Sequence, residues 1–214
     1  MLAARGLPHL LVSAIPAYSL PVNFLAHAYL ADASGDSIAG SLMGDFVKGP
    51  LDDRYGAAIR QALVLHRRID TYTDAHPTVG ASRARIGPER RRYAGILVDM
   101  FYDHFLARHW GDYSELSLER FTAKVYAALR ERHAMLPERL QTIAPRMAAT
   151  DWLASYRNVD AVGFALDRMG ERLKRGNALL GSAAELVANY AALEADFRLF
   201  FPDVVRFVRG QKSG

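Results

Sequence analysis

Two segments of the sequence carry ionisable side chains on helical faces that are otherwise apolar. His66 and Asp70 stand four residues apart and continue the stripe formed by Ala62 and Leu63. An imidazole and a carboxylate at this spacing can bind one divalent ion together, or the carboxylate can orient a ligating imidazole. A simple His–Asp hydrogen bond between packed helices explains the spacing equally well, so both interpretations stay open for this segment.

The second segment, residues 94–106, is an apolar run interrupted by Asp99, Asp103 and His104. Asp99 and Asp103 are one helical turn apart, where two carboxylates repel each other unless a cation or a shared proton lies between them. This pattern favours a metal site over a purely structural arrangement.

Two shorter segments add an imidazole and a carboxylate. His27 lies one turn after Asn23 on a short apolar helix, and Asp45 shares a helical face with Ile38 and Leu42. Taken singly, His27 or Asp45 is more typical of a core residue with a hydrogen-bond partner than of a metal ligand.

Together the four segments offer three histidines and four aspartates, and the chain has no cysteine. This oxygen and imidazole set suits Mn²⁺, Mg²⁺ or Fe²⁺ better than structural zinc. Helices that bring His and Asp together on a divalent ion are typical of metal-dependent phosphohydrolases. The alternative is an inert bundle with unusually many ion pairs in its core. No glycine-rich phosphate loop, serine-hydrolase elbow or dinucleotide fingerprint is present.

The elements that must position these residues are all expected to be helices. Apolar side chains recur at three- and four-residue spacing, and no alternating strand pattern or internal repeat occurs. We predict one helix over residues 152–169 and another that opens with a capping box at Ser182 and Glu185. Pro202 is expected to stop or kink that last helix. The fold class predicted is a single-domain all-α helical bundle.

Composition excludes several other classes. The 214 residues are 50% hydrophobic and 23% charged, which is typical of a globular domain and not of a disordered chain. The absence of cysteine excludes disulfide frameworks and cysteine nucleophiles. No apolar stretch is long enough to span a membrane. The net charge of +4 suits an acidic partner but is too small for a dedicated nucleic-acid binder.

Residues 1–21 differ from the rest of the chain in composition and in their lack of helical periodicity. They contain three prolines and a short apolar stretch but show no amphipathic period. We expect a poorly ordered N-terminal extension rather than a secretory signal, followed by one helical domain over residues 22–214.

Four blocks of the sequence carry a family resemblance. Residues 23–27 (NFLAH), 44–49 (GDFVKG), 66–70 (HRRID) and 103–106 (DHFL) resemble, in order and spacing, the bacterial acyl carrier protein phosphodiesterases. The resemblance implies an HD-domain-like helical fold, distantly related to HD-type phosphohydrolases. It also implies a cytoplasmic, Mn²⁺-dependent enzyme that removes the 4′-phosphopantetheine arm from holo acyl carrier protein. In that family the chain starts with Met where Val22 stands here, so residues 1–21 are expected to precede the native start.

The residues are assigned roles on this basis. The predicted metal-facing set comprises Asp45, His66, Asp70, Asp103 and His104, with His27 and Asp99 behind them. The predicted catalytic residues are His66, Asp70, His104 and Arg67. Any of the histidines that is not on the metal could protonate the leaving oxygen, and Arg67 or Arg68 could bind the phosphate. The predicted docking groups for the acidic carrier protein are Lys48, Arg83, Arg85, Arg90, Arg91 and Arg92.

Two other functions remain open from the sequence. One is an HD-like phosphohydrolase that acts on nucleotides or other small phosphate esters. The other is a non-catalytic helical module that binds acidic carrier proteins.

Overall fold

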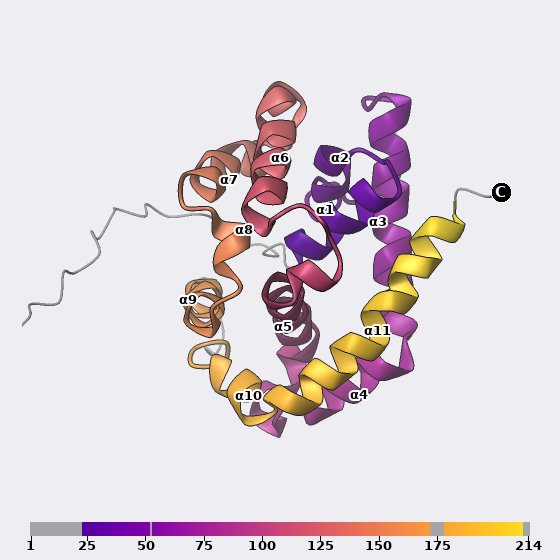
Figure 1. Cartoon of the computed structure of the whole chain (residues 1–214). Helices are drawn as coiled ribbons and strands as arrows, with labels where there is room; N and C mark the ends of the chain where they lie inside the picture. Colours follow the sequence, from indigo (N-terminus) through magenta and orange to yellow (C-terminus); the bar gives the residue numbers. More distant parts are fainter. Residues whose placement is uncertain (1–22, 52, 172–177, 212–214) are drawn as a thin grey trace, which may run out of the picture.

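The chain forms an all-α bundle, which confirms the predicted fold class. The computed structural model describes residues 23–51, 53–171 and 178–211, and no strand occurs among them (Figure 1). The expected extension over residues 1–21 lies outside the described residues.

The helices follow one another along the chain with short 3₁₀ turns between some of them. In chain order they are α1 (Phe24–Ala33), α2 (Ile38–Leu42), α3 (Ala57–Ala75), α4 (Pro77–Arg85), η1 (Pro88–Tyr93), α5 (Ala94–Arg108), η2 (Trp110–Asp112), α6 (Leu118–Glu131), η3 (His133–Met135), α7 (Glu138–Ala149), α8 (Trp152–Ser155), α9 (Val159–Gly170), α10 (Ala183–Ala188) and α11 (Tyr190–Gly210).

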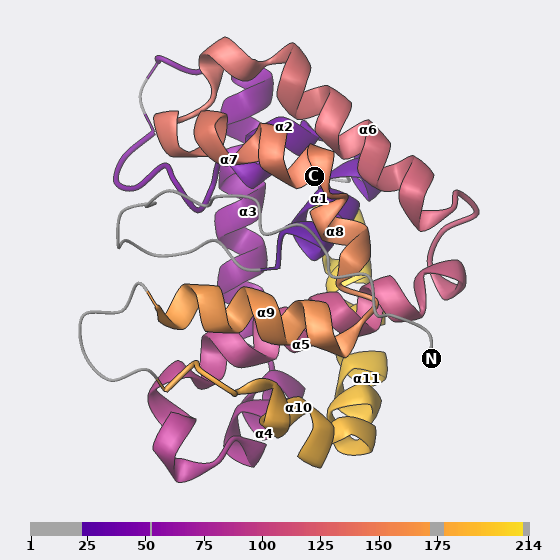
Figure 2. The same cartoon turned by 90° about the vertical axis from the view of Figure 1, so that its left-hand side faces the viewer.

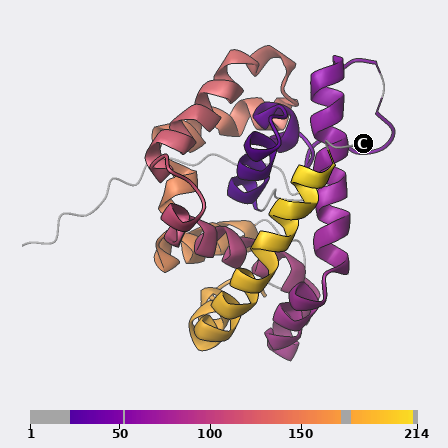
Figure 3. The ribbon, with the colours of Figure 1, turned by 45° about the vertical axis from the view of Figure 1, so that its right-hand side comes forward.

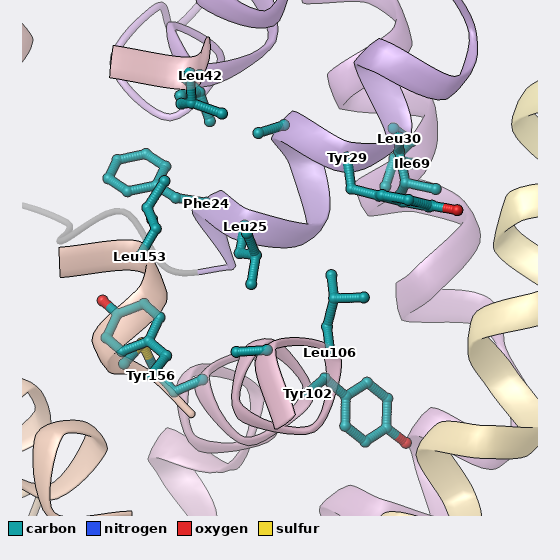
Figure 4. Packing of buried hydrophobic residues seen from close by; sticks show 14 of the residues in the cluster. Phe24, Leu25, Tyr29, Leu30, Leu42, Ile69, Tyr102, Leu106, Leu153 and Tyr156 are labelled. Carbon is teal, nitrogen blue, oxygen red and sulfur yellow. The ribbon is translucent and has the colours of Figure 1, made fainter. Parts of the chain in front are cut away.

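Helix α1 lies at the centre of the bundle. Its ten residues are apolar on nearly every side, so the helix must be surrounded by others rather than lie on the surface. It contacts α2, α3, α5 and α11. Figure 4 shows Phe24, Leu25 and Leu30 leaving α1 in different directions, each among apolar side chains of the surrounding helices. Most residues of α1, His27 among them, are therefore buried by the surrounding helices.

The N-terminus of α1 is capped by a side chain from α5. Asn23 adopts a left-handed conformation (φ 57°) and makes no side-chain cap. Instead, the two carboxylate oxygens of Asp103 accept hydrogen bonds of 2.9 Å from the backbone amides of Leu25 and Ala26. These amides have no partner within the helix, and an anion at a helix N-terminus is also favoured by the helix dipole.

The two longest helices, α3 and α11, lie along one side of the bundle and cross each other (Figure 3). Helix α11 buries one face that includes Phe197, Phe200 and Phe201. It also joins α4 and α5 through a buried polar chain. Ser82 donates a 2.9 Å hydrogen bond to Asp196, and its hydroxyl lies 2.8 Å from that of Tyr102.

Three local predictions are corrected in whole or in part. Pro202 is expected from the sequence to stop or kink the last helix, and the stop does not occur. Helix α11 continues to Gly210, because Phe201 and Val204 on either side of the exposed proline are buried. The helix expected over residues 152–169 is divided into α8 and α9. Figure 2 shows α9 running in a different direction from α8.

The third concerns the capping box at Ser182. The Ser182 side chain donates to the carbonyl of Leu179 instead of capping α10. Glu185 accepts hydrogen bonds from the Gly87 amide and from Arg90. Neither side chain therefore caps the first turn of α10. The single helix expected after Ser182 is also divided, because α10 ends at Ala188 and α11 begins at Tyr190.

Among the described residues, no helix combines the length and hydrophobicity that crossing a bilayer requires.

The contact between α2 and α3 gives a stability prediction. A Cβ atom on Gly40 would lie 2.8 Å from the Cβ of Ala62, so G40A must push α2 away from α3. We expect G40A to lower the free energy of unfolding by about 1–3 kcal/mol, measured by urea denaturation.

The matched control is G80A. Gly80 lies within α4 and has nothing within 4 Å of its Cβ position, so this substitution should stabilise the protein by about 0.5–1 kcal/mol. Equal effects of the two substitutions would contradict the close packing of α2 on α3.

Candidate metal centre

Side chains from α1 and α3 meet in a compact cluster. His27 on α1 and His66 on α3 are both buried, whereas the Asp70 side chain one turn along α3 is 46% exposed. The Nε2 atom of His27 lies 3.1 Å from one carboxylate oxygen of Asp70, and that of His66 lies 3.2 Å from the other. One ligand atom from each of the three residues lies within 4.8 Å of the others, a spacing that could hold a metal ion.

The two imidazoles are stacked face to face. Their ring centroids are 3.9 Å apart with an interplanar angle of 23°. Burial lowers the pKa of His27, and the charge of a protonated His66 would lower it further. Burial alone would raise the pKa of Asp70, but the adjacent His27 and His66 outweigh it and hold this pKa well below its usual range. A neutral imidazole and an ionised carboxylate are the forms that bind metal.

Asp45 extends the cluster from the segment that follows α2. One of its carboxylate oxygens lies 3.9 Å from Nε2 of His66, and the side chain is 19% exposed. Burial raises the pKa of Asp45, while the charges of His66 and His27 favour its ionised form. Asp45 therefore offers carboxylate oxygens as a fourth potential donor residue beside His66.

Several buried nitrogen and oxygen atoms of the cluster lack hydrogen-bond partners, as expected for side chains that bind a cation. Both ring nitrogens of His27, Nδ1 of His66 and one oxygen of Asp45 are buried without a hydrogen-bond partner. Nε2 of His27 is close to Asp70 but lacks the geometry of a hydrogen bond. Buried polar atoms without partners are costly. A divalent ion held between the Nε2 atoms and Asp70 would give Nε2 of His27 a partner, whereas the Nδ1 atoms point away from that position. Contacts of 3.1–3.2 Å are also what two ligands of one ion give when each bond is about 2.1 Å.

Gly44 allows His66 to occupy this position. A Cβ atom on Gly44 would lie only 2.2 Å from the ring atoms Cγ and Cδ2 of His66. The imidazole therefore packs directly on the backbone next to Asp45. The sequence does not reveal that Gly44 makes room for the His66 ring, because this contact depends on how two separate segments pack. Its only signal is that Gly44 belongs to the 44–49 block.

The structure does not bring every predicted ligand into the cluster. Both oxygens of Asp103 are occupied by the amides at the start of α1, as described above. Burial raises the pKa of Asp103 to about 7, although the bonds from Leu25 and Ala26 favour its ionised form. Asp103 thus positions the helix that carries His27 and does not complete the group of His27, His66 and Asp70.

His104 is also used elsewhere. Its Nδ1 lies 2.8 Å from the carbonyl oxygen of Tyr156, and its Nε2 lies 2.9 Å from the hydroxyl of Tyr190. Burial lowers the pKa of His104. In the neutral ring Nδ1 must donate to the carbonyl, which leaves Nε2 to accept from the Tyr190 hydroxyl. Both nitrogens are therefore engaged away from the cluster.

Asp99 lies near His27 but is not part of the cluster. With His27, Thr73 and Asn23 it lines a cavity of about 20 Å³, room for one water molecule. Burial raises the pKa of Asp99 to about 8, and Arg83 opposes this only in part. Asp99 is thus expected to be protonated at neutral pH.

Arg67 has a positioning role in the structure. One of its guanidinium nitrogens donates to the carbonyl oxygens of Val47 (3.2 Å) and Gly49 (2.7 Å). These bonds tie the segment after Asp45 to α3. Lys48, between the two carbonyls, is exposed, and its charge favours the ionised form of Asp45.

Most of the predicted docking arginines make contacts within the protein. Arg83 pairs with Asp74, and Arg85 pairs with Asp196. Arg90 pairs with Glu185. Arg91 donates to the Ile86 carbonyl, and Arg92 lies 6.0 Å from the ring centre of Tyr93. The basic stretch therefore holds α4 and η1 against α10 and α11, and its charge is partly neutralised.

The packing of Gly44 on His66 predicts a selective defect. G44A should displace the His66 ring and weaken Mn²⁺ binding by more than ~10-fold, measured by calorimetric titration. The matched control is G56A, because Gly56 precedes α3 and nothing lies within 4 Å of its Cβ position. Unchanged Mn²⁺ affinity in G44A would contradict the role of His66 as a ligand.

The protonated Asp99 predicts a pH dependence of stability. Its pKa is about 8 in the folded protein and about 3.8 as the ordinary value, so the folded state retains a proton that the unfolded state loses. The resulting stability is fully present below pH 3.8 and is lost as the pH rises through 8. Between pH 5 and 7 the slope from Asp99 is at most about 1.4 kcal/mol per pH unit.

This dependence can be measured on metal-free protein by urea unfolding at several pH values. D99N should flatten the decline between pH 5 and 7, whereas the exposed D53N should leave it unchanged. An identical decline in D99N and wild type would show that Asp99 is ionised in the folded state.

Comparison with known proteins supports the earlier resemblance. The family model described as acyl carrier protein phosphodiesterase matches residues 22–204. A relative named acyl carrier protein phosphodiesterase from Serratia proteamaculans is 37% identical over 186 residues, covering 86% of this chain and 96% of the relative. One with the same name from Klebsiella pneumoniae is 35% identical over 195 residues, covering 89% of this chain and all of the relative.

No solved structure matches the chain. The family match and the relatives nevertheless extend over most of the described helices, including the segments that carry His27, Asp45, His66 and Asp70. The chain therefore belongs to the acyl carrier protein phosphodiesterase family, whose members are phosphodiester hydrolases by name.

Proposed function

We propose that this protein hydrolyses the phosphodiester that joins 4′-phosphopantetheine to holo acyl carrier protein, releasing the apo form, in the cytoplasm. We further propose that the reaction requires a divalent cation, with Mn²⁺ as the first candidate. The single observation that supports this best is the cluster of His27, His66 and Asp70. Family membership supplies the substrate class.

The residues that would hold the cation are His27, His66 and Asp70, with Asp45 beside them. A divalent cation there would supply Lewis-acid stabilisation of a phosphoryl oxygen and would make water a better nucleophile near neutral pH. This proposal differs from the sequence prediction in two respects: His27, which the sequence predicts behind the ligands, is one of them, and Asp103 and His104 are not.

The remaining groups of the site would orient the reactants. Asp45 has a buried oxygen without a hydrogen-bond partner, so it can bind the cation or accept a proton from the attacking water. Arg67 would fix the segment that carries Asp45 rather than contact phosphate, because it donates to two backbone carbonyls. Lys48 is exposed next to this segment and is proposed to attract the acidic carrier protein.

The reaction can be tested directly with purified protein. Incubation with holo acyl carrier protein and Mn²⁺ should give the apo form by mass spectrometry, and a chelator should prevent it. Hydrolysis of nucleotides but not of the carrier protein would point to a different phosphohydrolase. Binding of the carrier protein without any product would indicate a non-catalytic module.

Substitutions distinguish the proposed ligands from the residues placed elsewhere. H66A and D70N should each lower Mn²⁺ affinity and turnover by more than ~100-fold, because each removes a ligand. H133A, at an exposed histidine in η3, is the control and should change neither.

His104 gives the sharpest comparison. H104Q should lower the melting temperature through its lost contacts to Tyr156 and Tyr190, but should leave Mn²⁺ affinity within about twofold. A loss of Mn²⁺ binding in H104Q with retention in H66A would overturn the proposed ligand set.

A further inference from the structure

The cavity that His27 and Asp99 both line is formed by residues of α1, α3, α5 and α11. Apolar side chains form most of its wall, and its volume of about 20 Å³ gives room for one water molecule. Polar side chains reach it from three directions, with Asn23 and His27 at α1, Thr73 on α3 and Asp99 on α5. A buried water needs two to four polar partners, and this cavity offers them.

The imidazole of His27 has one nitrogen that cannot take part in binding the cation. Its Nε2 lies 3.1 Å from Asp70, whereas Nδ1 points away from that position and is buried without a hydrogen-bond partner. A neutral imidazole that uses the lone pair of Nε2 for a cation must carry its proton on Nδ1. Histidines that bind a metal almost always donate this second N–H to a carboxylate, a carbonyl or a water molecule. Nδ1 of His27 therefore needs an acceptor, and no group among the described residues provides one directly.

Asp99 has the hydrogen-bonding capacity to complete such a contact. Its carboxyl group makes no hydrogen bond with any other residue of the described part of the chain. The charge of Arg83 acts on Asp99, but the guanidinium itself is paired with Asp74. A molecule in the cavity is thus the partner that remains for the Asp99 carboxyl group.

We propose that one water molecule in this cavity bridges Nδ1 of His27 and the carboxyl group of Asp99, which makes Asp99 a positioning residue for the candidate metal centre. The hydroxyl of Thr73 is the third partner of this water. The bridge orients the His27 ring and makes Nε2 a better ligand. The consequence for catalysis rests on the proposed function, whereas the bridge itself does not.

A crystal structure of the metal-free wild-type protein tests the bridge directly. We expect one ordered water molecule within hydrogen-bond distance of both Nδ1 of His27 and an oxygen of Asp99. Because water both donates and accepts, this expectation holds for either tautomer of the metal-free ring. A dry cavity, or a water that contacts only one of the two residues, would overturn the proposal. The unaltered protein is used, so the result does not depend on whether a variant folds.

Two substitutions of Asp99 separate positioning from packing. D99L should weaken Mn²⁺ binding ~10-fold in a calorimetric titration, the lower end of the range for lost partners of metal-binding histidines. Its unfolding midpoint in urea, measured without metal, should not fall, because leucine suits the apolar wall better than a buried carboxyl group does. D99N keeps a hydrogen-bonding side chain of the same shape and should bind Mn²⁺ within about threefold of the wild type.

The matched control is D53L, which removes an exposed carboxylate and should bind Mn²⁺ as the wild type does. Wild-type affinity in D99L would overturn the proposal. So would an equal loss of affinity in D99L and D99N, because the amide retains the hydrogen bond.

The outcomes also separate this inference from the proposed function. If H66A abolishes Mn²⁺ binding but D99L leaves it unchanged, the inference fails and the candidate metal centre stands. If D99L weakens Mn²⁺ binding but the wild type does not process holo carrier protein, the proposed function fails and the inference stands. No Mn²⁺ binding by the wild type would overturn the positioning role together with the candidate metal centre.

Discussion

The first amide groups of α1 need an acceptor in the interior of the protein, because this helix is surrounded by others. Asp103 supplies it with two hydrogen bonds of 2.9 Å from the middle of α5. The pair of bonds fixes where α1 begins and so helps to fix where His27 faces α3. An interaction that contributes no ligand thus determines whether two imidazoles from different helices meet. The arrangement of the candidate metal centre depends on it.

Much of the fold could be predicted from periodicity, but the meeting of the helices could not. His66 and Asp70 lie on one helix, so their four-residue spacing alone places them together. His27 joins them only through the packing of α1 on α3, and the sequence shows its burial without showing its neighbours. A buried polar residue needs a partner, but its position in the sequence does not identify that partner.

The same reasoning explains why two predicted ligands lie elsewhere. Asp103 and His104 share the apolar segment that suggested metal binding, and both are indeed buried. Their partners are the α1 amides and two tyrosines, Tyr156 and Tyr190, which come from other parts of the chain. The number of arginines between Arg83 and Arg92 likewise does not show how much positive charge is available to a partner. Asp196 and Glu185, about a hundred residues away, neutralise part of it.

The unequal exposure of the three candidate ligands has a consequence for the size of molecule that the protein can act on. His27 and His66 are enclosed, whereas almost half of the Asp70 side chain faces solvent. A bond attached to a whole folded protein cannot travel into a deep chamber, since its carrier is too bulky to follow. In the proposed reaction, the exposed Asp70 is the side on which the bond to be cut could reach the candidate centre while the carrier protein stays outside.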